Sequence, residues 1–142
     1  MPSDAFLITV AWRRRAFAAW SVEVPSSFAE TFVQEDRYWH AWDENRSVSL
    51  TSLVLTDHGR PVSVQRLIRR MPLLDGTPVE ELPVGLSGRA YVGPATAPAR
   101  ASMALTGMLA ANGRLLLVTI TSDDVAWARS TWCSIRGHPT TV

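Results

Sequence analysis

The stretch Leu115 to Ile120, which reads Leu-Leu-Leu-Val-Thr-Ile, decides the fold. Side chains of a β-strand point alternately to its two faces, and this stretch is apolar on both of them. A strand of that kind is covered on both sides, so we expect it at the centre of a sheet with a layer above and a layer below. The rest of the predicted architecture depends on this central position.

The residues just before this strand predict its antiparallel partner. Asn112-Gly113 favours a two-residue hairpin turn, because both central positions of such a turn need a positive φ. Residues 101–110 are therefore expected to be the partner strand, with apolar side chains on one face. These side chains are Met103, Leu105 and Leu109.

The residues after the central strand predict a helix. Ser122 is a good N-cap, and Asp123-Asp124 suits the positive end of the helix dipole. Gly137 and Pro139 end the helix and leave residues 138–142 as a tail. We expect a buried stripe of Val125, Ala128, Trp132 and Ile135, with Arg129 and Arg136 solvated.

The N-terminal part of the chain predicts two strands. Residues 5–12 are apolar and rich in β-branched and aromatic residues, and residues 17–24 alternate in polarity until Pro25 ends the pattern. Between these strands, Arg13-Arg14-Arg15 is expected to form a solvated turn. Residues 26–32 are expected to form a loop or a single helical turn.

The middle of the chain predicts a hairpin followed by a helix. Residues 37–56 alternate on either side of turn residues at 43–46. After a break at Asp57-His58-Gly59, residues 61–71 place apolar side chains at helical spacing. Residues 72–84, which contain three prolines, are the longest predicted loop. The helical stripe is Val64, Leu67, Ile68 and Met71, and residues 86–92 are a further short strand.

These elements combine into one α+β domain over residues 1–142. The domain is built on a mainly antiparallel β-sheet with helices packed on its faces. A chain of 142 residues can bury a core without a metal or a disulfide. Residues 5–137 are expected to be ordered.

Composition narrows the classes of partner and compartment. A net charge of +1 argues against nucleic acid as a partner, since that needs a clear basic excess on one face. Cys133 is the one cysteine, so no internal disulfide can form and we expect a cytoplasmic location. The apolar run 5–12 precedes its arginines, the reverse of a signal peptide, and it is too short to span a bilayer. We therefore expect no membrane partner.

Two sequence patterns suggest a family. Residues Trp20 to Pro25 read Trp-Ser-Val-Glu-Val-Pro, and Val118 to Ser122 lead into a helix that contains Trp127, Trp132 and Ser134-Ile135-Arg136. In these patterns the chain resembles the PsbP-like superfamily, which includes the extrinsic photosystem II protein, a Ran-binding import factor and small bacterial proteins. The resemblance implies an α/β/α sandwich that binds other macromolecules, and it implies no enzymatic activity. Residues 5–15 depart from the family, because they precede its usual start.

Patterns that would carry catalysis or metal binding are weak. His40, His58, His138 and Cys133 share no spacing typical of a metal site, so we expect no metal and no cofactor. Asp57-His58 lies in a loop where a catalytic pair would fit. An ordinary turn, in which the aspartate bonds local backbone, explains the same residues, and we expect no catalytic residue.

The predicted hairpin is the candidate binding region. Its aromatic residues and flanking arginines are of the types enriched in interface hot spots. One strand face would then pack in the core and the other would contact a partner. Alternatively, helices cover both faces and the aromatic residues are simply core. The candidate site residues are Arg37, Tyr38, Trp39, Trp42, Arg46, Asp57 and His58.

Three functional hypotheses follow. The preferred one is a non-catalytic protein-binding or accessory module of a bacterial cytoplasm, which recognises another protein through an exposed sheet face or the loop 72–84. The second is a small-molecule binder or enzyme with a pocket between the sheet and helix 61–71, using Asp57 and His58. The third is a homo-oligomer in which strand 5–12 pairs across a two-fold axis.

Overall fold

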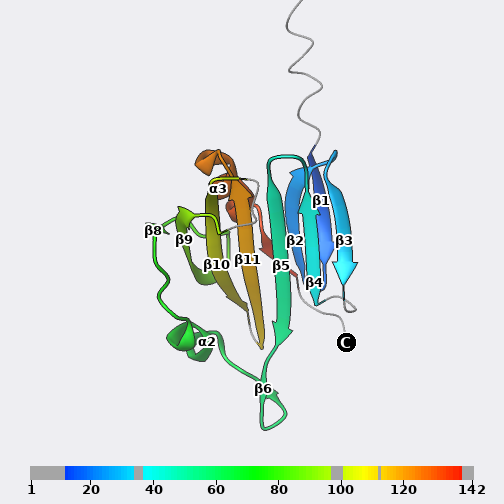
Figure 1. Cartoon of the computed structure of the whole chain (residues 1–142). Coiled ribbons are helices and arrows are strands. Elements are labelled where there is room, and N and C mark those ends of the chain that lie inside the picture. Colours follow the sequence, from blue (N-terminus) through cyan, green and yellow to red (C-terminus); the bar gives the residue numbers. More distant parts are fainter. Residues whose placement is uncertain (1–11, 34–36, 97–100, 112, 139–142) are drawn as a thin grey trace, which may run out of the picture.

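The computed structural model describes residues 12–33, 37–96, 101–111 and 113–138, with side chains from Ala18 onward. In this part of the chain a seven-stranded antiparallel sheet has the order β3-β4-β5-β11-β10-β9-β8 (Figure 1). β11, Arg114–Ser122, is the fourth of the seven strands. The predicted central position of residues 115–120 is therefore confirmed, and with it the α+β class.

The neighbours of β11 come from two predicted units of the chain. β11 pairs with β10 on one side and with β5 on the other, and all the pairings in this sheet are antiparallel. The hairpin predicted over residues 37–56 and the partner strand predicted over residues 101–110 are both confirmed. The strands around β11 are β3 Ala29–Val33, β4 Tyr38–Trp42, β5 Ser47–Val54, β8 Thr77–Val79, β9 Ser87–Pro94 and β10 Met103–Ala111.

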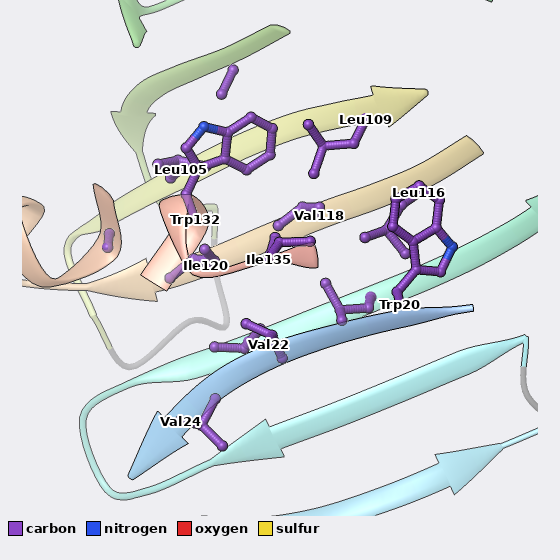
Figure 2. Packing of buried hydrophobic residues seen from close by; sticks show 14 of the residues in the cluster. Trp20, Val22, Val24, Leu105, Leu109, Leu116, Val118, Ile120, Trp132 and Ile135 are labelled. Carbon is purple, nitrogen blue, oxygen red and sulfur yellow. The ribbon is translucent and has the colours of Figure 1, made fainter. Parts of the chain in front are cut away.

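One face of the sheet, called here the inner face, carries the main core. Its β11 residues are Leu116, Val118 and Ile120, all of them buried. Figure 2 shows these side chains packed with tryptophans and valines from the covering layer. That layer consists of helix α3, Val125–Cys133, and a small sheet of β1 Trp12–Phe17, β2 Trp20–Pro25 and β12 Arg136–Gly137.

The opposite, outer face is covered at one end by helix α2, Val64–Arg70, among the described residues. Leu115 and Leu117 of β11 are half-buried at that end, whereas Thr119 is exposed. The expected second covering layer therefore extends over only the first half of β11. The two-residue strands β6 and β7, Thr56–Asp57 and Arg60–Pro61, form a hairpin that projects from the same end (Figure 1). The buried contact of α2 with β10 consists of Leu67, Met71, Met108 and Ala110.

Two edge strands lie where loops were expected, and those expectations were wrong. β3 occupies much of the expected loop 26–32, and β8 lies within the expected loop 72–84. The last residues of β3, 31–33, are all exposed, so the strand lacks the alternating burial that a sequence pattern can reveal. Pro78 is tolerated in β8 because an edge strand need not donate every N–H to a ladder.

The boundaries of two predicted elements near the ends of strands were also wrong. Arg13-Arg14-Arg15 lies within β1, paired with β2, rather than in a turn. The helix expected from Pro61 begins at Val64, because Pro61 pairs with Thr56 and Ser63 caps the helix. The antiparallel partner of each segment satisfies its backbone groups and so prevails over the local signal.

The C-terminal helix begins later than expected. β11 stays paired with β10 as far as Ser122, so the N-cap is Asp124, whose carboxylate accepts hydrogen bonds from the N–H groups of Ala126 and Trp127. Arg129, expected to be solvated, is half-buried, and its Nε atom has no hydrogen-bond partner. The flank of the helix that carries Arg129 is therefore packed more closely than its sequence indicated.

Parts of two predictions fall outside the described residues, namely residues 5–11 of strand 5–12 and residues 139–142 of the tail. The expected oligomer interface of strand 5–12 lies there with them. His138, also placed in the tail, donates its backbone N–H to Ala19 O at 2.6 Å, and its ring shares a hydrogen bond of 2.7 Å with Ser21 Oγ. Within the described residues, no helix has the length and apolar composition needed to cross a membrane.

Candidate functional site

Three rings form a row on the outer face, beyond the area that α2 covers. Tyr38, His40 and Trp42 share this face because alternate residues of a strand point the same way. The ring centroids of Tyr38 and His40 are 6.3 Å apart, and those of His40 and Trp42 are 5.0 Å apart, in stacked geometry. Each of the three side chains is half-buried. We call them the aromatic row.

A serine of the neighbouring strand β5 hydrogen-bonds to two rings of the aromatic row. Tyr38 Oη donates a hydrogen bond to Ser49 Oγ at 3.3 Å, and Ser49 Oγ lies 2.7 Å from His40 Nδ1. Because Ser49 accepts from Tyr38, its own hydroxyl can donate to an unprotonated Nδ1. Burial lowers the pKa of His40 below 6.5, which favours the same neutral form. The aromatic row is therefore uncharged at neutral pH.

The area beside the aromatic row is rich in hydroxyl groups and poor in charge. Among the described strand residues that point outward, Arg89 is the one that carries a permanent charge. Interface cores in proteins are likewise depleted of Lys, Glu and Asp. The hydroxyl residues that share this face with the row include Thr31, Ser47, Ser49, Thr51, Thr106, Thr119 and Thr121. Together with the aromatic row, we call them the open face.

The two tryptophans of β4 lie on opposite faces. Trp39 is 0% exposed in the main core, and its Nε1 donates to Glu30 Oε2 at 3.3 Å. Trp42 belongs to the open face. The core hypothesis for the hairpin therefore holds for Trp39, whereas Trp42 lies on the opposite, half-buried face, where a binding surface stays a prediction. Trp39 has no surface with which to contact a partner in this conformation.

The two candidate arginines of the hairpin differ in their surroundings. Arg46 donates two hydrogen bonds to Asp43 Oδ2, from Nε at 3.0 Å and from Nη2 at 2.7 Å. Its guanidinium lies 5.3 Å from the ring centroid of Phe28 and 4.8 Å from that of Trp127, in cation–π geometry. Arg46 therefore joins the hairpin tip to α3. Arg37 is exposed just before β4.

Asp57 and His58 lie on the β6–β7 hairpin, in a turn with φ values of 53° at His58 and 76° at Gly59. Positive φ at both central residues is what a primed hairpin turn requires. The His58 side chain is 94% exposed, with Nε2 3.5 Å from Asp57 Oδ1. Asp57 Oδ2 instead pairs with Arg66 Nη1 at 2.8 Å. The carboxylate thus connects the hairpin to α2, and the imidazole lies in solvent.

A cleft of about 500 Å³ lies between α2 and the outer face of the sheet. Small-molecule pockets are usually of this size, mostly apolar, with a few polar groups. His58 does not line this cleft and borders a more open hollow beside it instead. The sequence signals for the cleft were the apolar stripe of the predicted helix and the apolar outer positions of residues 115–117. The cleft, called here the α2 cleft, has an apolar lining of Leu55, Val62, Leu67, Met71, Pro72, Met108 and Leu115.

Other chemistry is sparse in the described part of the chain. It contains no group of three or more His, Cys, Asp or Glu side chains that could hold a metal ion. Burial and then the charge of Glu81 raise the pKa of the Cys133 thiol above 9.0, against the opposite effect of Arg136. The thiol is therefore protonated at neutral pH, and it is a poor nucleophile in that form.

Comparison with known proteins does not identify a family. No protein-family model matches the chain, and a search of curated proteins found no match. The geometry of the open face and of the α2 cleft is therefore the basis for any functional inference.

Proposed function

We propose that the protein is a non-catalytic accessory module of a bacterial cytoplasm that binds another protein through the open face. The observation that carries this proposal is an exposed sheet surface with three stacked rings and almost no charge. The solvent-facing side of an antiparallel sheet is normally polar and hydrated. Tyr and Trp supply rigid, amphipathic contact area at a low cost in conformational entropy, and Ser hydroxyls add adaptable hydrogen bonds.

The chemistry of the open face sets the expected partner. Its rings would bury apolar area, and its hydroxyl groups can both donate and accept hydrogen bonds. With His40 neutral, it offers no charge that would attract an acidic or a basic surface. The partner is therefore a protein surface with few charges, and the affinity should change little between low and high salt.

Photocrosslinking tests this proposal. A benzophenone amino acid at Thr119, in the middle of the open face, should capture one defined protein in the host cell. The same probe at Ser130, exposed on α3, is the matched control and should not capture it. A probe at Leu73 tests the other surface suggested by the sequence, the loop 72–84. Capture from Leu73 alone would transfer the contact to that loop and contradict the proposal.

Binding measurements with purified components then give the contribution of the open face to the affinity for the captured partner. Thr119→Arg introduces a buried charge into the contact and should weaken the captured partner's affinity at least tenfold. Ser130→Arg should leave the affinity unchanged. Trp42→Ala is the second test variant, because Trp39→Ala would remove a core residue and confuse binding with folding. Equal affinities for the Thr119→Arg and Ser130→Arg variants would overturn the proposal.

The finer fold and location are proposals too. A PsbP-like sandwich is supported by β2, which matches the Trp20–Pro25 pattern, and by β11, which leads into α3. The single cysteine supports a cytoplasmic location, since it forms no internal disulfide. Fractionation of the host cell tests the location, and recovery of the protein outside the cytoplasmic fraction would contradict it.

A second function is favoured by the α2 cleft, namely binding of a small molecule between the sheet and α2. The size and the apolar lining of the cleft support binding. The geometry favours a binder over an enzyme, because His58 lies outside the cleft and Asp57 is paired with Arg66. Saturable binding of an environment-sensitive apolar dye in the cleft tests this function. The absence of such binding would count against it.

A further inference from the structure

We propose that the α2 cleft binds an unbranched alkyl chain that ends in a single carboxylate, and that the guanidinium of Arg70 pairs with this carboxylate. This inference rests on the second proposal above, that the cleft binds a small molecule, and it is independent of the open face. It adds the chemical class of the ligand, which follows from the lining of the cleft and from its charges.

The apolar part of the lining is aliphatic. It consists of leucine, valine, methionine and proline side chains from α2, from its flanks and from β10 and β11, with no aromatic ring among them. Met71 and Met108 contribute thioethers, which are flexible and adapt to the shape of a ligand. A ligand with flat aromatic rings would find no aromatic side chain to stack on in this lining. A flexible hydrocarbon chain would fit it.

The charges of the cleft do not cancel. Asp57 and Arg66 both line it, and they neutralise each other through an ion pair of 2.8 Å. Arg70 also lines it, and within the described residues its side chain makes no hydrogen bond or ion pair. One uncompensated guanidinium matches a monoanionic carboxylate, with which arginine makes paired hydrogen bonds. A phosphate monoester would bring more charge than Arg70 alone can balance.

The two neighbouring arginines of α2 provide a matched pair of variants. Arg69 and Arg70 are both exposed and both lie in the last turn of the helix, but Arg69 does not line the cleft. Arg69→Gln and Arg70→Gln therefore remove the same charge from nearly the same place. A general effect of helix charge would change both variants equally.

The methionines provide the readout. In the full chain labelled with ¹³C at the methionine methyl groups, octanoate below its micelle-forming concentration should shift the signals of Met71 and Met108. Met103 packs against the main core on the inner face and should not move. Decanoate should bind roughly fifteenfold more tightly than octanoate, because it has two more methylenes and each buried methylene strengthens binding about fourfold. Arg70→Gln should weaken octanoate about fivefold, and Arg69→Gln should not.

Two further ligands distinguish a wrong carboxylate assignment from a cleft that binds no small molecule. Octan-1-ol has the same chain without a charge, and octylammonium reverses the charge. If octan-1-ol binds as tightly as octanoate and Arg70→Gln has no effect, the cleft is a small-molecule site but the carboxylate assignment is wrong. If none of the three shifts Met71 or Met108, the inference and the second proposed function both fail.

Discussion

The indole ring of Trp132 lies against Gly107, in van der Waals contact with the bare backbone of β10. A Cβ atom at position 107 would come within 2.6 Å of Cζ3 and 2.7 Å of Cη2 of this ring. Trp132 is fully buried, and its Nε1 donates to Glu81 O at 2.9 Å. One ring thus joins α3, the sheet and the loop before β9.

Gly107→Ala should destabilise the fold by about 1–3 kcal/mol, because the added methyl group has no space beside the buried ring. Gly93→Ala is the matched control, since a Cβ there would meet no atom closer than 3.9 Å. Denaturant unfolding measures both free energies. Equal unfolding midpoints for the two variants would show that the ring can move aside.

Ser52→Ala should cost about 1–3 kcal/mol, because it leaves a buried donor without an acceptor. Trp20 Nε1 donates to Ser52 Oγ at 3.3 Å between the small sheet and β5. In a Trp20→Phe background the donor is absent, so the same serine change should cost less. A double-mutant cycle measures the difference, and simple additivity would argue against a coupling between the two residues.

Arg46→Gln should lower the free energy of unfolding by about 1 kcal/mol, since it removes both the Asp43 pair and the stacking on Phe28 and Trp127. Arg37→Gln, at an exposed arginine of the same hairpin, should change it by less than about 0.5 kcal/mol. Thermal or chemical unfolding distinguishes the two. Equal losses would assign the effect to net charge rather than to these contacts.

His40 should make stability depend on pH below neutrality. Burial lowers its pKa in the folded state below 6.5, so between that lowered pKa and 6.5 the unfolded chain binds more protons than the folded one. The free energy of unfolding should therefore rise with pH through this window. The contribution is complete above 6.5 and is lost as pH falls through the folded-state pKa.

An NMR titration of the His40 ring measures the folded-state pKa directly. Urea unfolding across the same pH range, with His40→Gln as the control, measures the linked stability, and the rise should be smaller in the variant. A folded-state pKa at or above 6.5 would contradict both the sign of the dependence and the neutral form assigned to the aromatic row.

Much of the framework could be predicted from sequence because its signals are local. The apolar run at 115–120, the alternation around residues 43–46 and the stripe at Val64, Leu67, Ile68 and Met71 each lie within one strand, one hairpin or one capped helix, and the structure confirms each of them. The edge strands β3 and β8 were missed because the burial of their own residues does not alternate, although each pairs with the next strand along the chain.

The candidate site could be predicted only in part. Alternation along residues 38–42 places Trp39 and Trp42 on opposite faces, and this much was available from the sequence. Nothing local says which face is turned inward. That choice depends on β2 and α3, which pack on the Trp39 side, and on α2, which covers one end of the opposite face and does not reach Trp42.

The α+β class, the central strand and the amphipathic helix α2 follow from local sequence patterns, because hydrophobic periodicity is a property of neighbouring residues. Tertiary structure alone decided that Asp57 pairs with Arg66, that His58 lies in solvent, and that a cleft with Arg70 beside it remains between α2 and the sheet. These features depend on how far each covering element extends over the sheet, and that extent is set by contacts between segments distant in the chain.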